Sequence, residues 1–148
     1  MNEVEPETFL SANAAFAYLL RGLDQYANGL SEGDFKFFTT ALRNNHFLLR
    51  GPNAVLMLQW HSIYSNTLKD SKLIVCFYDR VPRLGGLVWS GDDDAQKLEL
   101  NKFDYRLTAL SRPAWVSEKI KIHPDEMAEY LMKRLMHHGG EQLKKRKV

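Results

Sequence analysis

The sequence predicts an α+β fold: a mostly antiparallel sheet of about five strands, with two helices before it and one helix after it. Near both ends of the chain, apolar side chains recur at intervals of three and four residues, the spacing of amphipathic helices. Between these ends lie runs that alternate in polarity or are rich in β-branched and aromatic residues, as strands are. The 148 residues contain no internal repeat and no linker rich in proline, glycine or serine, so we expect a single globular domain over residues 1–148.

The N-terminal part predicts two helices. The first spans about residues 7–29, and Gly29 is suited to end it. Its apolar face consists of Phe16, Leu19, Leu20, Leu23, Tyr26, Ala27 and Leu30. The segment Ser31–Asp34 resembles a capping box and predicts a second helix that ends at about Arg43. Phe35, Phe38 and Leu42 would share one face of that helix.

The middle of the chain predicts the sheet. His46–Arg50 is a first strand that turns at Gly51–Asn53, and Lys72–Arg80 has the composition of a buried strand. Lys97–Leu107 alternates in polarity, but its apolar residues change parity halfway along. A β-bulge near Asn101–Lys102 would return them to one buried face.

Four further stretches complete the expected sheet. Leu87–Ser90 is a short strand, Gly91–Asp94 is a turn, and Trp115–Ile122 is a half-exposed strand. Ala54–Tyr64 fits either a strand or a helix capped by Asn53. Its aromatic and β-branched side chains favour the strand, which we therefore expect.

The last element is a helix that starts at Pro124. Asp125 and Glu126 lie at its positive end, and Gly139-Gly140 are expected to stop it. Its apolar stripe consists of Ala128, Leu131, Met132 and Leu135. Residues 141–148 would then form a basic C-terminal tail.

The formal net charge of +2 conceals a gradient along the chain. Residues 1–35 carry six acidic and one basic side chain, whereas residues 119–148 carry eight basic and four acidic ones. A basic C-terminal end indicates a surface for a polyanion, and nucleic acid is the obvious example. The candidate nucleic-acid-binding residues are Lys133, Arg134, Lys144, Lys145, Arg146 and Lys147.

The motifs of several enzyme classes are missing from the sequence. Cys76, the single cysteine, lies inside an apolar run, where a thiol is a small hydrophobic group rather than a nucleophile. There is no G-x-S-x-G, H-E-x-x-H, C-x-x-C or phosphate-binding glycine motif, so we expect no catalysis, no cofactor and no metal. The alternative is a small hydrolase in which distant residues converge; its candidates are His61 or His123 with Asp79 or Asp104.

Apolar residues occur on more than one face of two of the expected helices. This distribution favours a protein that acts through contacts with other proteins. Phenylalanines and methionines lie on more than one side of their helices, which indicates deep burial or a partner, a homodimer included. These residues are Phe35, Phe37, Phe38, Met127, Met132 and Met136. We therefore expect a non-catalytic adaptor, and nucleic-acid binding through the C-terminus is the alternative. The acidic start of the chain and its short apolar runs predict no signal peptide and no membrane span, hence a cytoplasmic or nuclear location.

Overall fold

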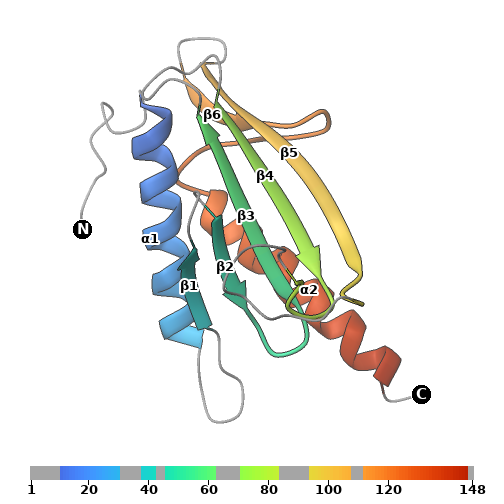
Figure 1. The fold of residues 1–148 in the computed structure, drawn as a ribbon. Helices are drawn as coiled ribbons and strands as arrows, with labels where there is room; N and C mark the ends of the chain where they lie inside the picture. Colours follow the sequence, from blue (N-terminus) through green and yellow to red (C-terminus); the bar gives the residue numbers. More distant parts are fainter. Residues whose placement is uncertain are drawn as a thin grey trace.

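A computed structural model describes residues 11–30, 38–42, 46–62, 71–83, 94–107 and 112–146. It is an α+β fold with one antiparallel sheet and two helices (Figure 1). The elements follow in the order α1 (Ala12–Leu30), β1 (Phe38–Leu42), β2 (His46–Arg50), β3 (Val55–Ser62), β4 (Ser71–Tyr78), β5 (Lys97–Leu107), β6 (Pro113–Val116), β7 (Lys121–Ile122) and α2 (Met127–Arg146).

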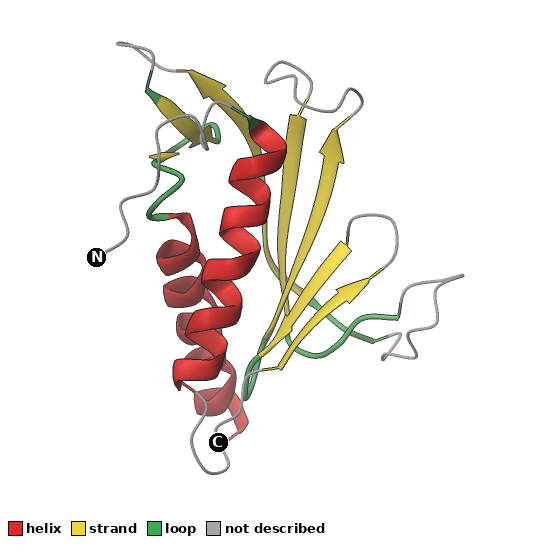
Figure 2. Cartoon of the chain, turned by 90° about the vertical axis from the view of Figure 1, so that its left-hand side faces the viewer, coloured by secondary structure: helices red, strands yellow, loops and turns green. Residues whose placement is uncertain are grey.

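The seven strands of the described residues form a meander, in which every strand pairs with its neighbours in the sequence. All six pairings are antiparallel, and β7 contributes two residues. Both helices lie on the same side of the sheet (Figure 2). Within the described part of the chain, neither helix is long and apolar enough to cross a membrane.

The core lies between the helices and the face of the sheet turned toward them, which we call the inner face. Alternate residues of β3 and β4, among them Leu58, Trp60 and Phe77, project into it, as the period of a strand requires. The helices bury one stripe each against these side chains, including Leu19 and Leu131. Burial of these two stripes is what orders the helices along the sheet.

Most of the expected elements are confirmed where the structure describes them. The first and last helices, the strand at His46–Arg50 and its turn are present, and the Gly51 N–H donates to the Ala54 carbonyl at 2.9 Å. The ambiguous stretch from Ala54 is the strand β3, with Leu56, Leu58 and Trp60 on one face. Leu87–Ser90 lies outside the described residues, as does the expected turn up to Asp93.

The prediction of a second N-terminal helix is wrong, because Phe38–Leu42 is the strand β1. All five of its residues pair with β2, from Phe38 opposite Arg50 to Leu42 opposite His46. Thr39 and Thr40 suit a strand, and pairing with an existing sheet edge outweighs a helical pattern that is supported by few apolar residues. The helical start signal at residues 31–34 lies outside the described residues.

The bulge in β5 lies nearer the start of the strand than expected. Pairing with β4 is continuous from Glu99 to Asp104 and shifts where Tyr78 pairs with Lys97, so that Leu98 is the extra residue. The inner face of β5 therefore carries Glu99 beside Phe103, while Leu100 is 48% exposed on the other face. The polarity pattern predicts the bulge at the wrong place because it assigns charged residues to the outer face. The Glu99 carboxylate instead lies on the inner face, where partners on α2 stabilise it.

Two boundaries near the C-terminus also differ from expectation. Trp115–Ile122 is two strands, because the chain turns at Ser117, whose Oγ accepts the Lys119 and Ile120 N–H groups at 3.4 and 3.3 Å. Gly139-Gly140 do not stop the last helix, and residues 141–146 continue it. A glycine in a helix costs only about 1 kcal/mol relative to alanine, too little by itself to end a helix that is anchored on the preceding turn.

Candidate functional site

The basic residues expected to form a C-terminal polyanion surface are distributed over α2 and are mostly paired. Lys133 contacts Glu129 at 2.9 Å, and Lys144 contacts Glu141 at 3.5 Å. Arg134 points toward the sheet and bonds Glu99. Lys145 is exposed, Arg146 ends α2 with a side chain that is not described, and Lys147 lies outside the described residues. The described side chains therefore do not form one block of unpaired charge.

Arg134 belongs instead to a polar cluster between α2 and β5. One oxygen of the Glu99 carboxylate accepts hydrogen bonds from Arg134 Nε and Nη2 at 3.0 and 2.7 Å and lies 2.7 Å from His138 Nε2. The other oxygen accepts from the Asn101 amide at 2.6 Å. The His138 ring also packs against Phe77, with 4.9 Å between ring centroids. This cluster fixes the middle of α2 to the sheet.

The cluster stabilises the ionised form of Glu99. Partial burial works in the opposite direction, but the hydrogen bonds from His138, Arg134 and Asn101 outweigh it, so the pKa of Glu99 is lower than its ordinary value. A carboxyl group whose pKa is lowered by folding stabilises the fold above its unfolded pKa. That stability is lost as the pH falls through the folded pKa.

We expect the substitution Glu99→Gln to lower the free energy of unfolding by about 1 kcal/mol at neutral pH. The difference from the wild type should shrink as the pH falls below about 4.5, where Glu99 of the unfolded wild type becomes neutral too. Urea unfolding between about pH 3 and pH 7 measures it. Glu118→Gln removes the same charge from an exposed turn and is the control. A difference that does not vary with pH would contradict the assignment.

The residues considered for a hydrolase are not brought together. His61 of β3 pairs with Lys72, and Asp104 pairs with Lys72 from the next strand, so His61 and Asp104 lie two strands apart. Asp79 follows the opposite end of β4 and accepts the Gln96 N–H at 2.8 Å. His123 Nδ1 accepts the Asp125 N–H at 3.1 Å, a local contact at the start of α2.

Cysteine chemistry and metal binding are the two other kinds of site that the described residues bear on. Cys76 is buried, and burial raises the pKa of its thiol, as expected of a residue in an apolar strand. Within the described ranges, no three side chains of histidine, cysteine, aspartate and glutamate are grouped as metal ligands would be.

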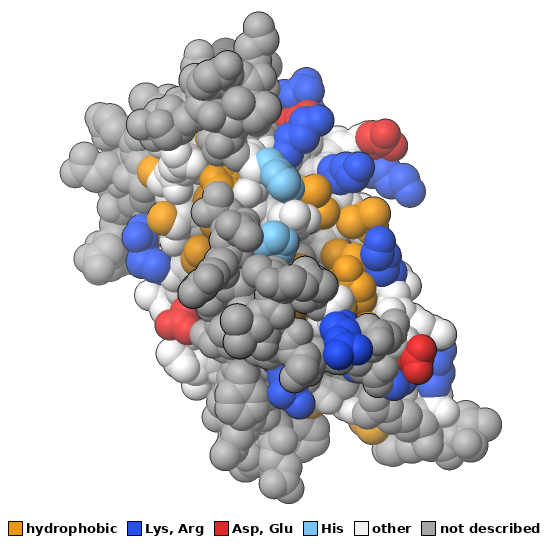
Figure 3. Space-filling model, in the orientation of Figure 1, with side chains coloured by type: hydrophobic (Ala, Val, Ile, Leu, Met, Phe, Trp, Pro, Cys, Tyr) orange, Lys and Arg blue, Asp and Glu red, His pale blue; other side chains and the backbone are white. Residues whose placement is uncertain are grey.

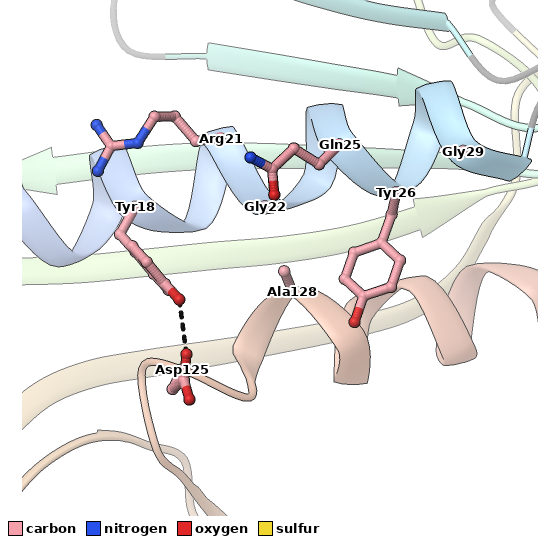
Figure 4. A pocket seen from close by; sticks show the side chains of 8 residues that line it. All are labelled: Tyr18, Arg21, Gly22, Gln25, Tyr26, Gly29, Asp125 and Ala128. Atoms are coloured by element: carbon pink, nitrogen blue, oxygen red, sulfur yellow. Dashed lines mark hydrogen bonds between the residues drawn. The ribbon is translucent and has the colours of Figure 1, made fainter. Parts of the chain in front are cut away.

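The structure places a groove where sequence analysis predicts no site, between the outer sides of α1 and α2 (Figure 4). Its volume is about 540 Å³. The two helices run in the same direction, and Gly22 lies close against Ala128. The groove is lined by Tyr18, Arg21, Gly22, Gln25, Tyr26, Gly29, Asp125 and Ala128.

The shape of the groove follows from the spacing of its residues on α1. Tyr18, Gly22 and Tyr26 are four residues apart and therefore lie on one side of the helix. Both tyrosine rings point from α1 toward α2, one on either side of the Gly22–Ala128 contact (Figure 4). Eight residues of helix separate the Cα atoms of Tyr18 and Tyr26 by about 12 Å, and the small residues between them leave a depression.

The two tyrosines of the groove differ in chemistry. The Tyr18 hydroxyl donates to Asp125 Oδ1 at 2.6 Å, and this hydrogen bond together with burial raises the pKa of Tyr18 to about 12. The Tyr18 side chain is therefore held in place by this hydrogen bond and forms one side of the groove. Tyr26 is 39% exposed, and the described part of the chain offers its hydroxyl no hydrogen-bond partner. Arg21, on the rim, forms no ion pair with any described carboxylate.

No protein-family model, curated protein or solved structure matches the chain.

Proposed function

We propose that the protein is a non-catalytic binding protein that holds a segment of a partner protein in the groove between α1 and α2. The observation that supports this function is the depression floored by Gly22 and Ala128 between Tyr18 and Tyr26. Tyrosine and arginine are enriched where proteins bind proteins, because they combine large apolar contact area with hydrogen bonding. The groove exposes both residue types on rigid helices.

The lining suggests the chemistry of the bound segment. A depression between two rings accepts one apolar or aromatic side chain as an anchor, which would pack edge-to-face or offset against Tyr26. The Arg21 guanidinium on the rim then favours a carboxylate next to that anchor, because its planar donors match a carboxylate. The partner that fits is a peptide segment with an apolar anchor and a neighbouring acidic residue.

Pairing of the C-terminal cations favours this function over nucleic-acid binding through α2. Three of the six candidate residues are already in contact with carboxylates of the same chain, which reduces the positive charge that they present to a phosphate. Within the described part of the chain, the groove residues Gln25 and Tyr26 have no such contact.

A photo-crosslinking experiment tests the groove directly. Benzoylphenylalanine in place of Gln25 is expected to give a discrete protein adduct when the protein is irradiated in its cells of origin. Tyr26→Ala in the same chain should reduce the yield about tenfold, since the loss of a central interface tyrosine typically weakens binding by this factor or more. Mass spectrometry identifies the adduct and the crosslinked peptide.

Two matched controls make the result decisive. Asn28→Ala changes an exposed residue of α1 that does not line the groove, and it should leave the adduct unchanged. Benzoylphenylalanine at Glu118, on the exposed turn before β7, should not give the same adduct. The proposed function is wrong if the adduct persists in Tyr26→Ala or forms equally from position 118.

A further inference from the structure

The face of the sheet turned away from both helices, the outer face, has its own pattern of side chains. Register places Leu48, Met57, Cys76 and Leu100 opposite one another across β2 to β5, so all four lie on this face. Leu48 and Met57 are buried in a second, smaller cluster, against which Tyr78 packs. Leu100 is the large apolar side chain of this row that is exposed.

Positive charge surrounds this apolar row. Lys97 and Lys102 lie on β5 on either side of Leu100, Lys72 lies on β4 and Arg50 on β2. All four are exposed, and none forms an ion pair with another described residue. Figure 3 looks onto this face and shows lysine and arginine side chains above, below and to the right of a strip of hydrophobic ones, with histidine side chains to its left.

Among the strand residues that the register places on the outer face, Asp104 is the acidic one. That carboxylate is neutralised by Arg106 of the same strand, at 2.9 Å. The exposed surface of α2, in contrast, carries acidic and basic side chains in pairs, Glu129 with Lys133 and Glu141 with Lys144. Among the described side chains, more unpaired cations therefore lie on the outer face than at the end of α2, where Lys145 is exposed and Lys144 is paired.

We propose that the outer face binds single-stranded nucleic acid. Phosphates would contact Arg50, Lys72, Lys97 and Lys102, and bases would pack on Leu100 and on the exposed part of Tyr78. Sheet geometry puts the Cα atoms of Lys72 and Lys102, which are one strand and two residues apart, about 8 Å from each other. Lysine side chains at that spacing can reach neighbouring phosphates of an extended strand.

The shape of the surface favours a single strand over a duplex. A duplex encloses its base faces and offers a flat sheet mainly phosphates, so the exposed Leu100 side chain between Lys97 and Lys102 would have no partner. A single strand exposes apolar base faces beside its phosphates, and sheets that bind single strands combine the same two features. The proposal is independent of the helix groove, which lies on the other side of the molecule.

Binding of a fluorescent oligothymidine of about 20 nucleotides to the full-length protein tests the proposal. Four phosphate contacts predict a slope of about −3 for the logarithm of the binding constant against that of salt concentration. Affinity should therefore fall about 50-fold between about 50 and 200 mM salt. The double variant Lys72→Gln/Lys102→Gln should bind more weakly, with a fall of about 7-fold over the same range.

The control is Lys144→Gln/Lys145→Gln, which removes the same charge from the end of α2 and should bind like the wild type. Leu100→Ala should weaken binding without changing the salt slope, because it removes a base contact and no phosphate contact. Circular dichroism spectra verify that every variant is folded. The proposal is overturned if the oligonucleotide does not bind or if both double variants lose affinity equally. It is also overturned if a duplex of equal length binds as tightly, or if only vesicles of anionic lipid bind.

Discussion

Replacing Trp60 with alanine is expected to lower the free energy of unfolding by about 3 to 5 kcal/mol, as truncation of a buried tryptophan does. Trp60 is 5% exposed and connects α1 to the sheet. Its ring stacks on Phe16 with 5.0 Å between centroids and meets the edge of Trp115 at 5.6 Å. Its Nε1–H donates to Asn13 Oδ1 at 2.9 Å. The substitution removes all of these contacts and leaves a cavity beneath α1.

Chemical denaturation followed by circular dichroism measures this loss without relying on tryptophan fluorescence. Two partial substitutions separate its sources. Trp60→Phe keeps an aromatic ring against Phe16 and should retain most of the stability. Asn13→Ala leaves the ring in place and removes the hydrogen-bond acceptor, a loss of about 1 kcal/mol. If Trp60→Ala costs no more than Asn13→Ala, ring packing does not hold α1 on the sheet.

The pattern of side chains predicts most of this fold because each long element buries one regular face. Apolar residues at helical spacing predict the first helix, and the composition of Lys72–Arg80 predicts a buried strand; the structure has α1 and β4 at these places. The errors arise where contacts between residues far apart in the sequence determine the local structure. Phe38–Leu42 is a strand because β2 pairs with it. Glu99 points inward because Arg134 and His138 form hydrogen bonds with its carboxylate. Neither partner is visible in a local window of sequence.

The candidate sites were harder to predict for the same reason. The groove depends on the contact between Gly22 and Ala128, which are far apart in the sequence and belong to no motif. The basic surface of the sheet is assembled from single cations on β2, β4 and β5. The run of basic residues at the C-terminus is conspicuous in sequence, yet two of the lysines counted with it pair with acids one helical turn away. The sequence shows how many charged residues a segment carries, but which of these charges remain unpaired depends on the fold.

Replacing Gly22 with alanine is expected to lower the free energy of unfolding by about 2 kcal/mol, although alanine favours a helix by about 1 kcal/mol over glycine. A Cβ atom on Gly22 would lie 2.8 Å from the Ala128 Cβ, closer than two methyl groups can approach. Neither methyl group can rotate away, because each is fixed to a helix backbone. The helices would have to separate, and the packing of α2 against α1 would loosen.

Gly29→Ala is the matched control, because its added Cβ would have no atom within 4 Å. It should leave the stability unchanged or raise it by up to about 1 kcal/mol. The double variant Gly22→Ala/Ala128→Gly moves the methyl group from α2 to α1 and should recover part of the loss, which makes the coupling measurable as a double-mutant cycle. Urea unfolding of the wild type, Gly22→Ala, Ala128→Gly, the double variant and Gly29→Ala tests this. Equal stability of Gly22→Ala and Gly29→Ala would contradict the close approach. The double variant also bears on the proposed function. It keeps the helices together but reshapes the floor between Tyr18 and Tyr26, so a partner anchored there should bind it less well than it binds Asn28→Ala, a change outside the groove.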